Sequence, residues 1–132
     1  MSGDENASGT DDMKAMLVMV HGSPREESND AVRRVVKIVR ASRLFEHVEI
    51  GYLDVNQPDI PSAFDSLSAT GATEVVAVPY FLHTGKHVTK DLPDVLDEAS
   101  RRHPHVSIRM TDYLGHSRVM ADILRDRARA AH

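Results

Sequence analysis

The sequence predicts an α/β protein: a three-layer sandwich built on a four-stranded parallel sheet, with a flavodoxin-like arrangement. Three observations predict this fold. Apolar, β-branched runs alternate with amphipathic helical patterns along the chain, in the order β-α-β-α-β-α-β-α. The connections between them are short, which favours parallel strands joined by right-handed crossovers. The length of 132 residues is enough for one domain and too short for two.

The first twelve residues differ in composition from the rest of the chain. They contain four acidic residues, no basic residue and too few apolar side chains to offset the entropy of ordering. We therefore predict a disordered acidic tail at 1–12 and one folded domain at 13–132. Without the tail, 16 of the 20 acidic residues remain against 16 basic residues, so the folded body is formally neutral.

Composition also excludes several classes of function. The chain has no cysteine, which excludes disulfides, thiolate metal sites and cysteine nucleophiles and fits a reducing, cytoplasmic setting. A neutral body with only 5% aromatic residues argues against a nucleic-acid partner. No apolar run approaches the ~20 residues of a membrane span, and the polar N-terminus lacks the features of a signal peptide. We expect neither nucleic acid nor membrane as a partner.

The first half of the chain gives two strands and two helices. A continuous apolar run predicts a central strand from Ala15 to Val20. Ser28 or Asn29 can cap the helix that follows. The inward stripe of that helix should consist of Val32, Val35, Val36 and Val39. Alternating apolar residues predict a second strand from Phe45 to Leu53.

A short helix should follow the loop that ends this second strand. Pro61 suits the first helical position and Gly71 suits the stop. Its buried side should consist of Ile60, Phe64 and Leu67.

The second half repeats the alternation. Thr73 to Val78 is rich in β-branched residues and predicts a third strand, followed by a long loop from Pro79 to Lys90. Pro93 can open a helix that ends near His103, and Val106 to Met110 alternates as a fourth strand. The last helix should carry an apolar stripe made of Val119, Met120, Ile123 and Leu124.

Histidine and glycine follow two of these buried strands. The first strand runs into His21-Gly22-Ser23, and the third runs into a loop that contains His83, Gly85 and His87. Ligands of open parallel sheets bind beyond the carboxyl ends of the strands, where strand order reverses. If the first and third strands are central neighbours, their histidines meet at that edge.

The residues of the long loop leave two interpretations open. Two histidines four residues apart can bind one divalent ion if the loop folds back, and neutral imidazole is a common ligand of transition metals. Alternatively, one of the two is only a solvent-exposed loop residue, and we assign that role to His83 and the functional role to His87. Lys86 and Lys90 add positive charge that suits a carboxylate-bearing ligand. The sequence contains no P-loop, dinucleotide fingerprint or nucleophile elbow.

Three motifs together resemble one family. They are V-x-V-H-G-S at the first strand, V-E-I-G-Y-L-D-x-x-x-P-x-I-P after the second, and V-V-A-V-P-Y-F-L-x-x-G-K-H-V-x-x-D-L-P after the third. Over about Ala15 to Arg129 the chain is similar to the class II chelatases, in particular the short, single-domain sirohydrochlorin cobaltochelatases and their iron-inserting relatives of the siroheme branch. The resemblance implies a chelatase-like fold and a lyase-class enzyme that inserts a divalent metal into sirohydrochlorin.

The resemblance also implies roles for residues. His21 and His87 would be the paired catalytic imidazoles that hold the metal. Because the unperturbed pKa of imidazole is about 6.5, we also expect one of them to accept a pyrrole proton. The family's carboxylate, usually the longer Glu, falls on Asp54. Leu114-Gly115-His116 resembles the exit of the family's fourth strand but is about one residue shorter, so His116 receives no role. We expect a substrate surface formed by Gly22, Ser23, Asp54, Tyr80, Phe81, Leu82, Gly85 and Lys86, with Arg25 and Lys90 near the peripheral carboxylates of the ring.

Cobalt is the metal we expect, with iron or nickel as the alternatives, in cobalamin or siroheme biosynthesis. No permanently bound cofactor is implied, because the ion is a substrate. The short enzymes resemble half of a two-domain chelatase, which implies a homodimer. Two other functions stay open: a non-catalytic metal or tetrapyrrole carrier on the same fold, and a metal-free acid–base enzyme that uses His21 and Asp54 on a small anionic substrate.

Overall fold

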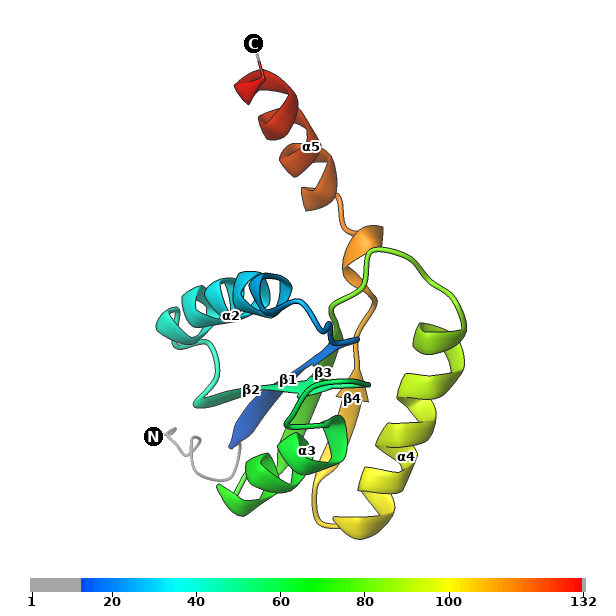
Figure 1. Ribbon diagram of the computed structural model, residues 1–132. Helices are drawn as coiled ribbons and strands as arrows, with labels where there is room; N and C mark the ends of the chain where they lie inside the picture. The colour runs from blue at the N-terminus through cyan, green and yellow to red at the C-terminus, as the bar shows by residue number, and fades with distance from the viewer. Residues whose placement is uncertain (1–12, 132) are drawn as a thin grey trace.

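Four parallel strands form the centre of the structure (Figure 1). It is a computed structural model, and it describes residues 13–131; the tail predicted at 1–12 lies outside them. The sheet order is β2-β1-β3-β4. The strands are β1 (Lys14–Val20), β2 (His47–Tyr52), β3 (Glu74–Pro79) and β4 (Ser107–Met110). This order confirms the predicted parallel sheet with the first and third strands as central neighbours.

Helices cover both faces of the sheet. On one face lies α2 (Glu26–Ala41), and on the other lie α3 (Ile60–Ala69) and α4 (Leu92–Arg102) (Figure 1). A π-helical turn, η1 (His87–Asp91), precedes α4, and a 3-10 turn, η2 (Leu114–His116), precedes the last helix, α5 (Val119–Ala130). Among the described residues, no helix combines the length and the apolar content that crossing a bilayer requires.

Two apolar clusters fix the sheet between these helices. Leu17 and Met19 of β1 are fully buried in the larger cluster, against α3 and α4, together with Phe64. Val18 of β1 points the other way and packs with Val36 of α2. Burial of β1 on both faces is what the continuous apolar run predicted for a central strand. The strand ends are therefore held rigidly, which matters because the candidate site lies on them.

The start of α2 differs from the prediction. The N-cap position is Arg25, with no side-chain cap, and Ser28 and Asn29 lie inside the helix. Asn29 is only 2% exposed and donates from Nδ2 to the backbone carbonyl of Ser23 at 3.0 Å. Its amide therefore ties the helix to the preceding loop instead of capping the helix end.

The apolar stripe of α2 is also narrower than predicted. Val32 and Val36 are buried and Val39 is half-buried, but Val35 is 44% exposed. The helix lies over the β2 and β1 side of the sheet (Figure 1). Val32 and Val36 pack with residues of these two strands, whereas Val35 does not belong to that cluster.

The short helix α3 follows its sequence signals. Asp59 is its N-cap and accepts a hydrogen bond from the backbone N–H of Ser62 at 2.9 Å. Pro61 lies in the first turn, and Gly71 follows the helix with a φ of 94°. Because that φ lies in the left-handed region, glycine ends the helix as predicted.

The long loop after β3 is shorter than predicted, because helical structure begins at His87 and not at Pro93. In a regular α-helix the ring of Pro93 would clash with the carbonyl four residues earlier, that of Thr89. The wider π turn relieves that clash, and the backbone N–H and the hydroxyl of Thr89 both donate to Gly85 at 2.8 Å. His87 is thus the first residue of a helical segment.

The last helix forms where predicted but does not cover the sheet. Figure 1 shows α5 extending away from the body beyond the carboxyl ends of the strands. The turn η2 holds it there, since the N–H groups of Leu114 and Gly115 donate to the carbonyl of Phe81 at 3.0 and 3.2 Å. A Cβ on Gly115 would lie 1.7 Å from the carbonyl oxygen of Leu82, so only glycine allows this contact.

Candidate functional site

The loop after β1 is locked to the loop after β2. Gly22 has a φ of 104°, and a Cβ there would lie 2.1 Å from the carbonyl oxygen of Asp54. The N–H of Asp54 donates to the carbonyl of His21 at 2.9 Å. Glycine is therefore required for the close approach of these two chain segments. His21 is exposed, on a backbone that two loops fix.

Side-chain amides add to this lock. The N–H of Ser23 donates to Oδ1 of Asn56 at 2.7 Å, and the Ser23 hydroxyl accepts from the N–H of Arg25 at 3.0 Å. The sequence interpretation missed Asn56, and it gave Asn29 the role of a helix cap and not that of a link to the loop. The link formed by Asn29 could have been found, because Asn29 is a polar residue placed three positions before Val32 on the inward stripe of α2. Nothing in the sequence singles out Asn56.

The three apolar residues of the predicted substrate surface that follow β3 point in different directions. Tyr80 packs against the cluster under α2, and its N–H donates to Met19 at 2.8 Å. Phe81 packs on the opposite side, against the larger cluster, while Leu82 is 56% exposed. The ring centroid of Phe81 lies 6.3 Å from that of His87. Of the three, Phe81 is the side chain that the structure brings next to His87.

The structure brings His21 and His87 together. Their ring centroids lie 5.1 Å apart, with an interplanar angle of 66°. His21 comes from the end of β1, and His87 opens the helical segment after β3. The two central parallel strands thus deliver imidazoles 66 positions apart in the chain to one edge of the sheet, as the strand order predicted.

The hydrogen bonds of the two rings define which nitrogen of each is free. Nδ1 of His21 lies 3.1 Å from the carbonyl oxygen of Gly22, and Nδ1 of His87 lies 2.8 Å from Oδ2 of Asp91. Carbonyl and carboxylate oxygens accept, so each Nδ1 is the donor. A neutral ring then carries its lone pair on Nε2, which is the form that binds a metal ion. Sequence reasoning missed this role of Asp91.

The remaining predicted residues lie outside this pair. His83 is exposed and its ring is not part of the pair. Oδ1 of Asp54 accepts from the N–H of Val55 at 2.8 Å, within its own loop. Lys90 donates to Asp94 at 2.7 Å, and that carboxylate raises the pKa of Lys90. Gly85 and Lys86 are exposed in the loop, and a Cβ on Gly85 would meet no atom within 4 Å.

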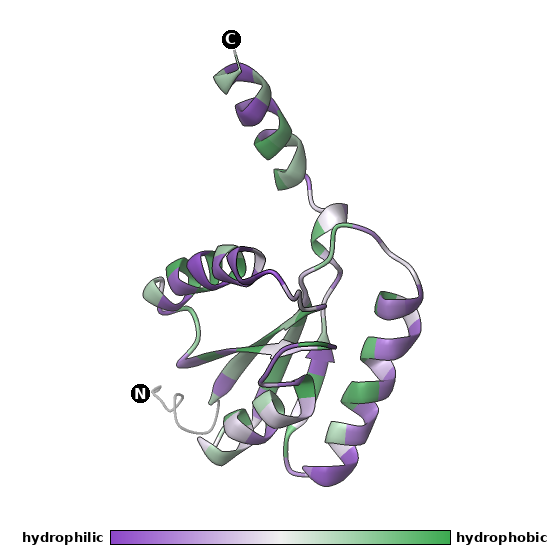
Figure 2. Ribbon diagram, in the orientation of Figure 1, coloured by the Kyte–Doolittle hydropathy of each residue, from purple (hydrophilic) through white to green (hydrophobic). Residues whose placement is uncertain are grey.

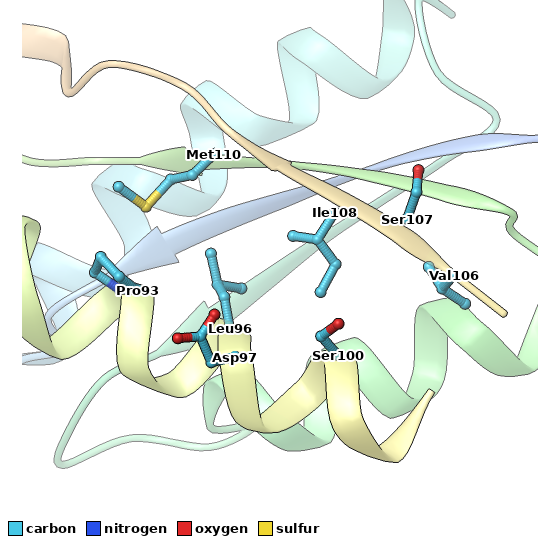
Figure 3. A pocket seen from close by; sticks show the side chains of 8 residues that line it. All are labelled: Pro93, Leu96, Asp97, Ser100, Val106, Ser107, Ile108 and Met110. Atoms are coloured by element: carbon cyan, nitrogen blue, oxygen red, sulfur yellow. The ribbon is translucent and has the colours of Figure 1, made fainter. Parts of the chain in front are cut away.

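Two imidazoles are the donors that the site offers a metal. Within residues 13–131, no group of three or more His, Asp or Glu side chains is arranged to hold an ion. Two nitrogen ligands leave most coordination positions of a metal ion open. Such a site suits an ion that binds transiently better than one that is held permanently. A hollow of about 300 Å³ between α4 and β4 is separate from the pair (Figure 3). It is lined by Pro93, Leu96, Asp97, Ser100, Val106, Ser107, Ile108 and Met110.

Comparison with known proteins identifies the family. The family model described as CbiX matches residues 15–131, nearly the whole described chain. The chain belongs to the CbiX family. A relative of this CbiX-family chain, the sirohydrochlorin cobaltochelatase of Sulfurisphaera tokodaii, is 30% identical over 87% of this chain and 91% of its own length. The chloroplastic sirohydrochlorin ferrochelatase of Arabidopsis thaliana is also 30% identical, over 90% of this chain and 53% of its own length.

Solved structures show the same fold. The sirohydrochlorin chelatase SirB from Bacillus subtilis subspecies spizizenii, in complex with cobalt, superposes with a TM-score of 0.84 at 24% identity over 89% of this chain. A cobalamin biosynthesis CbiX protein from Marinobacter aquaeolei gives 0.78 at 19% identity over 89% of this chain and 96% of its own. The CbiX-family chain spans 50% of that SirB chain, and 59% of a Methanococcus aeolicus cobaltochelatase that it matches.

Proposed function

We propose that this chain inserts a divalent metal ion into sirohydrochlorin, as a lyase-class chelatase with ion and tetrapyrrole as its two substrates. The observation that carries the proposal is the His21–His87 pair, 5.1 Å between ring centroids, at the carboxyl edge of the central strands of a CbiX-family chain. Insertion exchanges two pyrrole N–H protons for one M²⁺. The oxidation state of the metal does not change, so no redox partner is required.

His21 and His87 have different roles in ion binding and proton transfer. Both present a free Nε2 that can hold the incoming ion near the ring face. We assign the proton transfer from the pyrrole to His87, because Nδ1 of its ring is held by the carboxylate of Asp91 at 2.8 Å and Nε2 is left as the acceptor. Nδ1 of His21 donates to the carbonyl of Gly22 at 3.1 Å, which leaves Nε2 of His21 as a metal ligand. Phe81 lies beside His87 as an apolar contact for the macrocycle.

Cobalt is the metal we propose, for cobalamin or siroheme synthesis in the cytoplasm. Archaeal relatives named sirohydrochlorin cobaltochelatases support cobalt, and the ferrochelatase from Arabidopsis thaliana keeps iron as the alternative. Two imidazoles bind cobalt, nickel and ferrous iron in one general affinity order, so the ligands alone do not select among them. We also propose that the chain acts as a homodimer.

The direct test is turnover. Sirohydrochlorin mixed with cobalt(II), iron(II) or nickel(II) should change its absorption spectrum faster with the protein than without it. His21→Ala and His87→Ala should each lower the catalysed rate by roughly 10²–10⁴-fold, while His83→Ala leaves it unchanged. Binding of both ring and ion without faster insertion would instead identify a carrier.

A further inference from the structure

Basic side chains line a hollow beside the edge strand β2. The hollow has a volume of about 470 Å³ and lies between α2, β2 and the loop that follows β2. Its lining consists of Arg33, Lys37, Arg40, Glu49, Ile50, Tyr52, Gln57 and Pro58. None of these residues belongs to the imidazole pair or to the predicted substrate surface, so the hollow is a separate feature of the molecule.

The three cations of the hollow lie on one flank of α2. Arg33, Lys37 and Arg40 occupy positions i, i+4 and i+7, which follow one side of a helix. This flank borders the stripe of Val32 and Val36 that is buried on the sheet. Figure 2 shows α2 with hydrophilic and hydrophobic residues interspersed along its length. Packing of the apolar stripe therefore holds the cations over the edge of β2.

The positive charge on this flank is only partly balanced. Nη1 of Arg33 lies 3.1 Å from Oε2 of Glu26 and also pairs with Asp30. Within residues 13–131, neither Lys37 nor Arg40 forms an ion pair with a carboxylate. Two uncompensated positive charges therefore line the hollow, and they suit a ligand with two negative charges.

The carboxylate of Glu49 does not cancel these charges. Glu49 lies between Val48 and Ile50, whose side chains pack in the cluster under α2. Because successive side chains of a strand point to opposite faces, the side chain of Glu49 points to the other face of the sheet.

A buried hydroxyl belongs to the same hollow. Tyr52 is 2% exposed, and its ring packs in the cluster under α2. It lines the hollow, and its phenol oxygen lies within electrostatic range of Arg33. In the part of the chain that the structure describes, this hydroxyl has no hydrogen-bond partner. Buried tyrosine hydroxyls usually have one, so a ligand in the hollow would supply the missing acceptor.

The edge of β2 leaves room for a compact ligand and not for an added strand. Nε of Arg40 donates to the carbonyl of Val48 at 3.0 Å. The N–H of Tyr52 donates to the carbonyl of Pro58, also at 3.0 Å. Since alternate residues of a parallel strand face its outer edge, Ile50 is the one outward position between these two contacts. A peptide that pairs as a strand needs several consecutive positions.

We propose that this hollow binds a compact dianion, whose two charges come either from one phosphate group or from two neighbouring carboxylates. Lys37 and the Nη groups of Arg40 neutralise its charge, and the hydroxyl of Tyr52 donates a hydrogen bond to it. The site uses none of the chemistry assigned to His21 and His87. It therefore stands or fails independently of the chelatase function.

Anion titration gives the first test. Inorganic phosphate and malonate are each titrated into the full chain at low ionic strength, and calorimetry measures their dissociation constants. Lys37→Gln should raise these constants by at least about 10-fold. Arg34→Gln is the matched control, because Arg34 is an exposed cation of the same helix that does not line the hollow. Failure of both anions to bind below about 10 mM, or equal effects of the two variants, overturns the proposal.

Tyr52→Phe tests the buried hydroxyl without removing the ring. We expect the dissociation constant of the bound anion to rise by about 3–10-fold. The urea midpoint of the anion-free protein should stay unchanged, because the fold loses no hydrogen bond. Tyr80→Phe, in the same cluster but outside the hollow, is the control. Native affinity in Tyr52→Phe, or a lowered midpoint, would show that the hydroxyl serves the fold and not a ligand, and would overturn the site.

Competition identifies the source of the two charges. Phosphate that binds at least about 10-fold more tightly than malonate assigns the site to a phosphate group. Metal-free sirohydrochlorin that displaces phosphate from the native chain, and binds more weakly to Lys37→Gln, assigns it to carboxylates on the rim of a tetrapyrrole. Chloride that displaces phosphate at equal concentration removes the preference for a dianion and overturns the proposal.

Discussion

The carboxylate of Asp91 fixes which nitrogen of His87 carries the proton. Its Oδ2 lies 2.8 Å from Nδ1, which leaves Nε2 for the ion. We expect Asp91→Ala to weaken cobalt(II) binding by roughly 10–100-fold, the usual effect of losing such a partner, and Asp91→Asn, which can still accept, to weaken it less. Isothermal titration with cobalt(II) measures both.

Asp94 supplies the matched control for this prediction. It lies three residues further along, is 59% exposed and pairs with Lys90 at 2.7 Å. Asp94→Ala removes a carboxylate from the same helical segment but leaves His87 unaffected. If Asp94→Ala weakens cobalt binding as much as Asp91→Ala, general electrostatics and not the orientation of His87 accounts for the effect.

Gly22 is the residue at which backbone conformation limits the site. With a φ of 104° and a prospective Cβ 2.1 Å from the carbonyl of Asp54, Gly22→Ala must move one of the two loops. We expect a loss of at least about 2 kcal/mol in the free energy of unfolding, measured with urea. Gly85→Ala, where a Cβ meets no atom within 4 Å, should stay within about 0.5 kcal/mol of the native protein.

Among the elements, α3 depends on its cap. The side-chain and backbone hydrogen bonds from Ser62 lower the pKa of Asp59 in the folded state. A lowered folded pKa gives stability that is present above the unfolded value near 3.9 and is lost as pH falls through the folded value. Asp59→Ala should therefore cost about 1 kcal/mol at pH 7 and clearly less at pH 2. Asp97→Ala, at an exposed position inside α4, should show no such loss in the same urea titrations.

A second carboxylate joins α3 to α4 at the opposite end of the sheet. Nε2 of His103 lies 2.7 Å from Oδ1 of Asp65, and Arg102 also contacts that carboxylate. The His103 hydrogen bond lowers the pKa of Asp65. This pair stabilises the packing of the two helices and lies away from the imidazole pair, so acid should loosen α3 through both of its aspartates.

The sequence predicts those elements whose signals lie within a short stretch of the chain. It does not predict contacts that depend on the exact geometry of a turn or on packing. The strands carry their own apolar patterns, and the parallel topology then brings His21 and His87 to one edge of the sheet. The strand order and the proximity of the two rings were therefore predicted correctly. The role of Asp91 depends on η1, whose helical geometry brings residues 87 and 91 together, and the prediction of a loop there concealed it. For α5, an apolar stripe predicts a helix but not whether that helix packs on the sheet.

At the scale of the whole molecule, ion binding at the imidazole pair should raise the stability of the entire fold. The pair joins the ends of the two central strands, and it exists only when the sheet is formed. Cobalt(II) at about 100 times its dissociation constant should add about 2.7 kcal/mol and raise the melting temperature by roughly 10 °C. Differential scanning calorimetry measures this rise, which should disappear in His21→Ala and His87→Ala and persist in His83→Ala. An unchanged rise in His87→Ala would show that the ion binds elsewhere, since His87 supplies one of the two nitrogens on which the stabilisation depends.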